Sequence, residues 1–146
     1  MKTNFVIRRA GTPEEVMRCY PVMAQLRPQY SAQAFLAQVQ AQMQEGFQLA
    51  YACEGDKVVT VAGFRLIRNL AWGRFLYVDD LVTDAQQRSR GAGQAMLAWL
   101  VEEARRCGCD QLHLDSGVQR LDAHRFYERE GMQRSSYHFA INLKND

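Results

Sequence analysis

The sequence predicts a mixed α/β fold in a single domain that spans residues 1–146. Some segments alternate apolar and polar residues with the period of a strand, and others repeat apolar residues at helical spacing. No repeat, linker or low-complexity segment divides the sequence. The predicted order is strand, helix, helix, three strands, helix, strand, helix and strand, which makes one α/β unit.

The N-terminal part predicts a strand and a capped helix. Residues 5–9 have a short strand pattern. Thr12 is a suitable N-cap for the helix that follows, and Glu15, three residues later, completes a capping box. We expect Pro21 to disturb this helix at its middle and Pro28 to end it, because proline lacks the N–H that a helix interior needs.

A second helix is predicted at residues 31–46, after which the apolar period changes to two. The next three segments, residues 47–54, 57–68 and 74–83, read as strands joined by short turns. Because the turns are short, these strands predict an antiparallel meander.

The meander leads into a glycine-containing turn and the longest helical pattern of the chain. The turn reads Arg88-Ser-Arg-Gly-Ala-Gly. The apolar residues that follow at helical spacing are Met96, Leu97, Leu100, Val101 and Ala104. Glu102 and Arg106 are spaced to pair on the opposite, solvated face. Gly108 then ends the helix at a position that favours a left-handed cap.

This turn has the properties of an anion site. A helix begins with four backbone N–H groups that have no partner within the helix, and its dipole leaves about half a positive charge there. Glycines let a phosphate approach those donors closely, and Arg88 and Arg90 add positive charge. The spacing is neither the Walker pattern nor Gly-x-Gly-x-x-Gly. The alternative is a turn whose glycines only allow close packing.

Three further elements complete the prediction. Residues 111–115 alternate as a strand, and residues 120–130 form a short helix that Gly131 ends. Residues 135–143 also alternate and predict a last strand.

The composition is ordinary for a soluble globular protein, with 47% hydrophobic and 23% charged residues. A net charge of +2 argues against a strongly basic nucleic-acid-binding protein. The sequence has no apolar run of about 20 residues and no N-terminal signal core. We therefore expect a cytoplasmic protein with neither a nucleic acid nor a membrane as its partner.

The cysteines do not predict disulfides or a metal site. Cys19, Cys53, Cys107 and Cys109 form no paired framework, and a cytosolic chain would keep them reduced. Cys107, Cys109 and His113 do not have the usual zinc-ligand spacing. We expect thiols that pack or lie at the surface, and no bound metal.

Two motifs in this order resemble the GNAT N-acetyltransferases. The first is Arg88-x-x-Gly91-x-Gly93 after the fourth strand, and the second is Ala123-His-Arg-Phe-Tyr127-Glu-Arg-Glu-Gly-Met132, in which Met132 replaces the family's final Phe. The resemblance covers essentially the whole chain. It implies a mixed, mostly antiparallel sheet with a splayed parallel strand pair, flanked by about four helices. It also implies acetyl transfer from acetyl-CoA to an amine.

The resemblance further implies which residues bind acetyl-CoA. The backbone of Leu81, Val82 and Thr83 would pair with the pantetheine arm, although the side chains of Leu81 and Val82 are also suited to a core. Pyrophosphate would be held by the N–H groups of Ser89, Arg90, Gly91, Ala92, Gly93 and Gln94. The side chains of Arg88 and Arg90 would assist. Arg120 stands where many relatives have an asparagine that contacts the cofactor.

Tyr127 occupies the position of the family's general acid. A phenol with a pKa of about 10 can protonate a leaving thiolate, whose pKa is about 8.5, with little driving force. The alternative is a core tyrosine, because aromatic residues on helices usually pack in a core.

Asp79 is the candidate base, acting through a water, because an ammonium must lose a proton before it attacks. In many relatives a glutamate stands at the position of Tyr77 or Asp79. Asp80 would point to the other face of its strand unless a bulge intervenes. The alternative role for Asp79 and Asp80 is binding of a cationic substrate.

The charge of the acceptor stays open. Tyr77-Val-Asp-Asp80 is similar to a segment of spermidine/spermine acetyltransferases. Residues 118–131 look closer to aminoalkylphosphonate N-acetyltransferases. These two classes of enzyme act on substrates of opposite charge.

The function expected from the resemblance is direct acetyl transfer from acetyl-CoA to a primary amine of a small molecule. Two alternatives are acetylation of a protein amine, either a lysine or an N-terminus, and a non-catalytic acyl-CoA-binding regulatory module. Homodimers are common among similar proteins, so we expect a homodimer.

Overall fold

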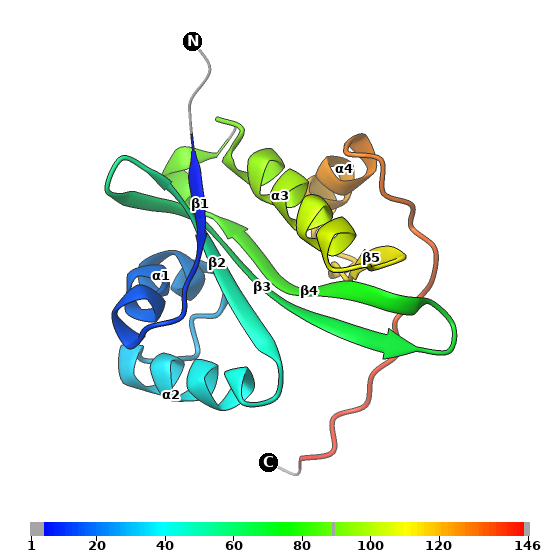
Figure 1. Cartoon of the computed structure of the whole chain (residues 1–146), viewed down its shortest axis with the longest axis horizontal. Helices are drawn as coiled ribbons and strands as arrows, with labels where there is room; N and C mark the ends of the chain where they lie inside the picture. Colours follow the sequence, from blue (N-terminus) through cyan, green and yellow to red (C-terminus); the bar gives the residue numbers. More distant parts are fainter. Residues whose placement is uncertain (1–4, 89, 145–146) are drawn as a thin grey trace. The chain divides into compact units, whose positions relative to one another are not determined.

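The computed structural model describes residues 5–88 and 90–144 and is shown in Figure 1. The chain forms two compact units, Met1–Leu114 and Asp115–Asp146. The prediction of one domain over residues 1–146 stays a prediction, and each unit is described by itself.

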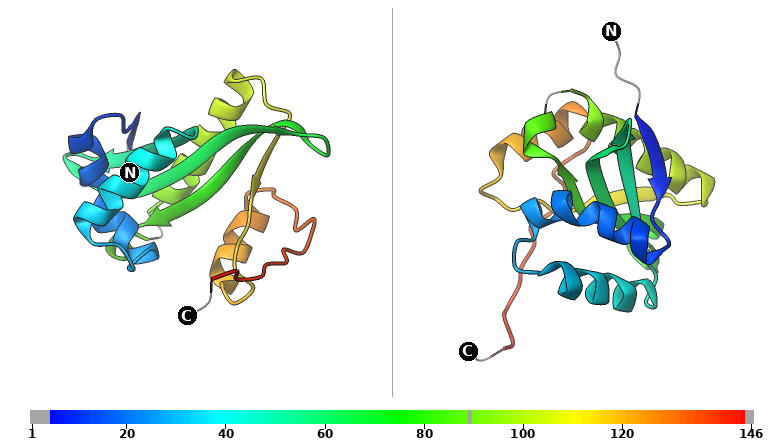
Figure 2. Two further views of the ribbon diagram at one scale, coloured as in Figure 1. Left: turned by 90° about the horizontal axis from the view of Figure 1, so that it is seen from below. Right: turned by 90° about the vertical axis from the view of Figure 1, so that its left-hand side faces the viewer.

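A five-stranded mixed sheet forms the centre of the first unit. Its strands, in sheet order, are β1 (Val6–Arg9), β2 (Phe47–Glu54), β3 (Lys57–Asn69), β4 (Gly73–Thr83) and β5 (Gln111–Leu114). Neighbouring strands are antiparallel from β1 to β4, whereas β4 and β5 are parallel. The predicted meander and the mixed sheet are confirmed. The β3–β4 hairpin projects beyond β2, as the left view of Figure 2 shows.

Helices cover both faces of this sheet (Figure 1). Helices α1 (Pro13–Leu26) and α2 (Ala32–Met43) lie on one face, and α3 (Ala92–Arg106) lies on the other. Strand β2 shows how the alternation serves two cores: Leu49 and Tyr51 pack with α1 and α2, while Ala50 and Ala52 pack with α3. The sheet is therefore the middle of three layers.

Helix α1 begins as predicted but does not break at its internal proline. The Thr12 hydroxyl accepts a hydrogen bond from the Glu15 amide at 3.2 Å, and the Glu15 side chain completes the capping box. The expected disturbance at Pro21 is wrong, because the helix continues to Leu26. Its buried residues on both sides of the proline, among them Cys19 and Val22, hold the helix against the sheet despite the missing N–H.

The second unit contains α4 (Leu121–Arg129), and Gly131 follows it with a φ of 95°, as predicted. The predicted last strand at residues 135–143 is wrong, because these residues form no strand. The side chains of its apolar positions are at least 82% exposed: Tyr137, Phe139, Ile141 and Leu143. An alternating segment forms a strand only where its backbone can pair with another strand, and residues 115–144 contain no strand that could serve as this partner.

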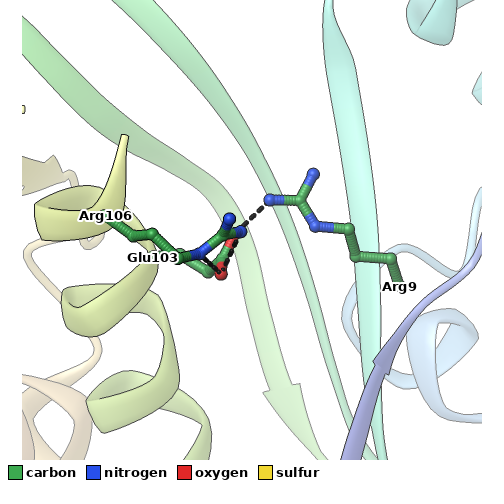
Figure 3. Close-up of polar contacts among 3 residues, drawn as sticks. All are labelled: Arg9, Glu103 and Arg106. Atoms are coloured by element: carbon green, nitrogen blue, oxygen red, sulfur yellow. Dashed lines mark hydrogen bonds and ion pairs between the residues drawn. The ribbon is translucent and has the colours of Figure 1, made fainter. Parts of the chain in front are cut away.

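An ion cluster joins the edge strand β1 to α3 (Figure 3). Glu103 is 8% exposed, and its carboxylate accepts hydrogen bonds from Arg9 and from Arg106, the latter at 2.6 and 2.7 Å. The expected pairing of Glu102 with Arg106 is wrong. Glu102 instead pairs with Arg105, three residues away at 2.7 Å.

The pKa of Glu103 reflects this environment. Burial alone raises it, but hydrogen bonds from Arg106 and Arg9 outweigh burial and lower the pKa below its ordinary value. The carboxylate therefore stabilises the folded chain fully above the pKa of an unfolded glutamate, about 4.3. This stabilisation is lost as the pH falls through the lower folded-state pKa.

We expect Glu103→Gln to lower the free energy of unfolding at pH 7 by about 1–3 kcal/mol, because it leaves Arg9 and Arg106 without their carboxylate. The difference from the parent chain should shrink as the pH falls below about 4. Urea titrations at several pH values measure it. The matched control is Glu102→Gln, whose exposed pair contributes little. Equal losses in the two variants would contradict a special role for the cluster.

Candidate functional site

Strand β4 loses its neighbour on one side halfway along its length. Its parallel pairing with β5 runs only from Phe75, opposite Gln111, to Val78, opposite Leu114. Leu81, Val82 and Thr83 continue to pair with β3 on the other side. Among the described residues, no strand pairs with these three on the side of β5. This part of β4 therefore presents a backbone edge to which an extended ligand can bind as an added strand.

The loop after β4 is held in place by α1 and β2. Asp84 caps the short 3₁₀ helix η1 (Ala85–Gln87), and the Ala85 amide donates to the Gln25 side chain of α1 at 2.9 Å. Arg90 donates to the side chain of Gln87 at 2.8 Å and to that of Glu54 at 3.0 Å. The loop thus has fixed contacts on both sides, which keeps the guanidinium of Arg90 beside the start of α3.

Helix α3 begins at the predicted glycine turn, and its role as an anion site stays a prediction. Gly91 is the N-cap with a φ of 90°, a conformation that glycine adopts without strain, and no side-chain hydrogen bond caps the helix among the described residues. The first backbone bond of the helix is donated by Ala95 to the Gly91 carbonyl at 2.9 Å. The amides of Ala92 and Gly93 precede that bond, so they have no carbonyl partner within the helix. Ser89, also predicted to bind pyrophosphate, lies outside the described residues.

A β-bulge places both candidate carboxylates on one face of the sheet. Gly63 pairs with Asp80, but the next residue of β3, Phe64, pairs with Val78, so Asp79 is an extra residue in β4. Asp79 and Asp80 both line a pocket on the face covered by α1 and α2. The bulge that could turn Asp80 to the face of Asp79 is therefore present in the structure.

This pocket, the α-face pocket, has a volume of about 500 Å³. Its walls come from the end of α1, from the residues between α1 and α2, from α2 and from strands β2, β3 and β4. The charged residues that line it are Arg27, Glu45, Arg65, Asp79 and Asp80. A Cβ atom on Gly63 would lie 2.4 Å from the Phe47 ring, so this glycine allows the ring to lie on the pocket floor.

Two arginines hold the two carboxylates in different ways. Arg65 donates to both oxygens of Asp79, each at 2.8 Å. Arg27 contacts only Oδ1 of Asp80, from Nε at 2.8 Å and from Nη2 at 2.7 Å. Burial raises the pKa of Asp80 above its ordinary value, and Arg27 offsets only part of this rise. The charged form of Asp80 is therefore stabilised less fully than that of an aspartate in water.

Tyr127 and Arg120 belong to the second unit. Arg120 is the N-cap residue of α4, and Tyr127 lies within that helix. Burial raises the pKa of the Tyr127 phenol above its ordinary value, and the nearby charge of Arg120 lowers it in part. Tyr127 therefore keeps its proton throughout the neutral range. His124 contacts the Gly117 carbonyl at 2.8 Å, and Asp115 faces His138 at 3.6 Å.

Sequence reasoning missed Arg27 and Arg65. Arg65 is 14 residues from Asp79 and lies on the neighbouring strand, and Arg27 is 53 residues from Asp80. No local spacing connects such residues, so only the strand register and the position of α1 reveal the two pairs.

Two other kinds of feature are absent from the described part of the chain. Within residues 5–88 and 90–144, no group of three or more His, Cys, Asp or Glu residues is arranged to hold a metal ion. In the same residues, no helix combines the length and the apolar character needed to cross a membrane.

Comparison with known proteins shows the family. The model of the acetyltransferase (GNAT) family matches residues 12–132. The chain is 33% identical over 135 residues to the uncharacterized N-acetyltransferase YhdJ of Bacillus subtilis, covering 91% of this chain and 95% of that protein. It is 40% identical over 62 residues to the aminoalkylphosphonate N-acetyltransferase of Salmonella typhimurium, covering 42% of this chain and 40% of that protein.

A solved structure agrees with this result at the level of the fold. The aminoglycoside N-acetyltransferase AAC(6')-Iy, in complex with CoA, has a TM-score of 0.84 and 13% identity, with 97% of this chain and 96% of that chain covered. Together with the family model and the similarity to YhdJ, the fold shows that this chain belongs to the GNAT family and is an acetyltransferase.

Proposed function

We propose that this acetyltransferase transfers an acetyl group from acetyl-CoA directly to a primary amine of a small molecule. The observation that carries the proposal is the position of the α-face pocket. Its two carboxylates, Asp79 and Asp80, come directly before the unpaired edge of β4. A volume of about 500 Å³ is within the range of small-molecule sites. This size favours a small acceptor over a protein chain.

The residues around β4 and α3 are suited to acetyl-CoA, which supplies an activated acetyl thioester when bound. In this proposal the backbone edge of Leu81, Val82 and Thr83 holds the pantetheine arm. The start of α3, with the amides of residues 89–94, holds the diphosphate, and Arg88 and Arg90 add charge. Arg120 is a further candidate for a phosphate contact. The solved structure of AAC(6')-Iy with CoA supports this assignment through its shared fold.

Two proton movements accompany the reaction. The amine arrives as an ammonium, so one proton must leave its nitrogen before the N–C bond forms. Asp80 is the better acceptor for that proton, directly or through a water, because burial raises its pKa and Arg27 contacts only one of its oxygens. Asp79, with both oxygens bonded to Arg65, is more suited to anchoring the substrate.

The second proton belongs to the leaving group. As the C–S bond breaks, the sulfur leaves as a thiolate and needs a proton. The Tyr127 phenol keeps its proton at neutral pH, because burial raises its pKa, and it is the group proposed to supply that proton.

The homodimer and the cytoplasmic location remain predictions.

We expect Asp80→Asn to lower kcat/KM for the amine about 10²- to 10⁴-fold, the usual contribution of a general base. In the parent chain, activity should rise with pH as Asp80 loses its proton, at a pH above the ordinary aspartate range. Asp80→Asn should remove this acidic limb of the pH–rate profile. The matched variant is Asp79→Asn, which should keep the limb and mainly raise KM. If Asp80→Asn keeps the limb and Asp79→Asn loses it, the assignment is wrong.

We expect Tyr127→Phe to lower kcat about 10²-fold or more, because the leaving thiolate loses its proton donor. The affinity for acetyl-CoA, measured by calorimetry, should change less than twofold. Tyr137→Phe, which makes the same substitution at a side chain 85% exposed, is the control and should have the parent rate. An unchanged kcat in Tyr127→Phe would remove this residue from the mechanism.

A further inference from the structure

The charges that line the α-face pocket are unevenly paired. Arg27 and Arg65 are each bonded to a carboxylate, of Asp80 and of Asp79, at 2.7–2.8 Å. Glu45, which also lines the pocket, is exposed, and its side chain makes no ion pair or hydrogen bond within the described residues. The two arginines and three carboxylates therefore give the lining one excess negative charge, located at Glu45.

The strand order separates Asp80 from Glu45 within the pocket lining, because Asp80 comes from β4 and Glu45 from the turn before β2, and these two strands flank β3 on opposite sides. Asp80 pairs with Gly63, and Gly63 pairs with Leu49 on the next strand, so two strand spacings, about 10 Å, separate Asp80 from Leu49. Glu45 precedes Leu49 by four residues, in the turn between α2 and β2. This separation of the two backbone positions suits an extended ligand better than a compact one.

Apolar side chains line the pocket between these two positions. Phe35 and Val39 of α2 and Phe47 of β2 line the pocket and are buried. Beside them, Gln38 donates to Gln42 at 2.9 Å, so the amides of this part of the wall are bonded to each other. An apolar wall between two carboxylates is complementary to methylene groups between two cationic ends.

An anionic acceptor would meet the opposite arrangement. Its anionic group would compete with Asp79 or Asp80 for a guanidinium that already has a carboxylate partner, and it would lie beside that carboxylate; the two carboxylate side chains are 23% and 15% exposed. A second cationic group on the acceptor does not compete for either arginine, because it can pair directly with Glu45.

We propose that the acceptor is an extended amine with a second cationic group, of the α,ω-diamine class. Its reacting nitrogen lies at Asp80, and its distal ammonium binds Glu45. This inference rests on the proposed function and adds the substrate class and a specificity-determining residue to it.

The test compares three acceptors of similar length: butane-1,4-diamine, 4-aminobutan-1-ol and 3-aminopropylphosphonate. Thiol release from acetyl-CoA measures kcat/KM for each at low ionic strength. Per amino group, which divides the diamine value by two, the diamine should exceed the amino alcohol about two- to fivefold, the contribution of one exposed ion pair, and the phosphonate should be the poorest. Longer diamines, up to octane-1,8-diamine, locate the best spacing. The preference should fall as salt is added.

Glu45→Gln should reduce the preference for the diamine over the amino alcohol, taken per amino group, to near one, through KM rather than kcat. The matched control is Glu14→Gln, which removes the same charge from an exposed position of α1 outside the pocket. This control should keep the parent preference.

The outcomes separate the two proposals. If the phosphonate is the best acceptor, or if Glu45→Gln keeps the parent preference, the diamine inference is wrong while acetyl transfer to a small amine stands. If none of the three acceptors, and no longer diamine, releases thiol above the rate without an amine, the diamine inference is wrong; if a panel of other small primary amines also releases none, the proposed small-amine function is contradicted.

Discussion

The whole candidate site depends on one constraint, which is that strand β4 leaves its parallel neighbour after Val78. Up to that residue, β4 is an interior strand with partners on both sides. Beyond it, the bulge at Asp79 turns two carboxylates toward one face, and the backbone of Leu81–Thr83 has an unpaired edge in the described part of the sheet. The glycine loop and α3 follow within a few residues. One interruption in strand pairing therefore brings together the place that we propose for the acyl donor and the place that we propose for its acceptor.

The end of helix α1 connects these two places. Its Gln25 side chain accepts from the Ala85 amide in the loop that precedes α3, whereas Arg27, at the C-cap of the same helix, bonds to Asp80 in the α-face pocket. The helix is held against the sheet by its buried apolar face. Packing of this one amphipathic helix thus positions Gln25 at the loop before α3 and Arg27 at the α-face pocket. In this way buried residues that do not line the candidate site still determine its geometry.

Local patterns predicted much of this molecule, because caps, turns and amphipathic periods depend on neighbouring residues. The capping box of Thr12, the strands of the meander and the left-handed glycines after α3 and α4 follow from such patterns. Long-range pairing did not follow. The alternation of residues 135–143 contains no information about a partner strand, and none forms within the second unit. Arg27 and Arg65 reach their carboxylates only through tertiary structure and strand register, which sequence spacing does not reveal.

The central claim is that the unpaired edge of β4 and the start of α3 together receive the acyl donor. Amide hydrogen exchange with and without saturating CoA tests it most directly, because the claim concerns backbone N–H groups. We expect CoA to slow exchange in residues 81–83 and 90–94, while residues 66–68 of β3, which pair with the opposite end of β4, exchange at an unchanged rate. If CoA binds but leaves exchange in both of these segments unaltered, the site described for this acetyltransferase is wrong.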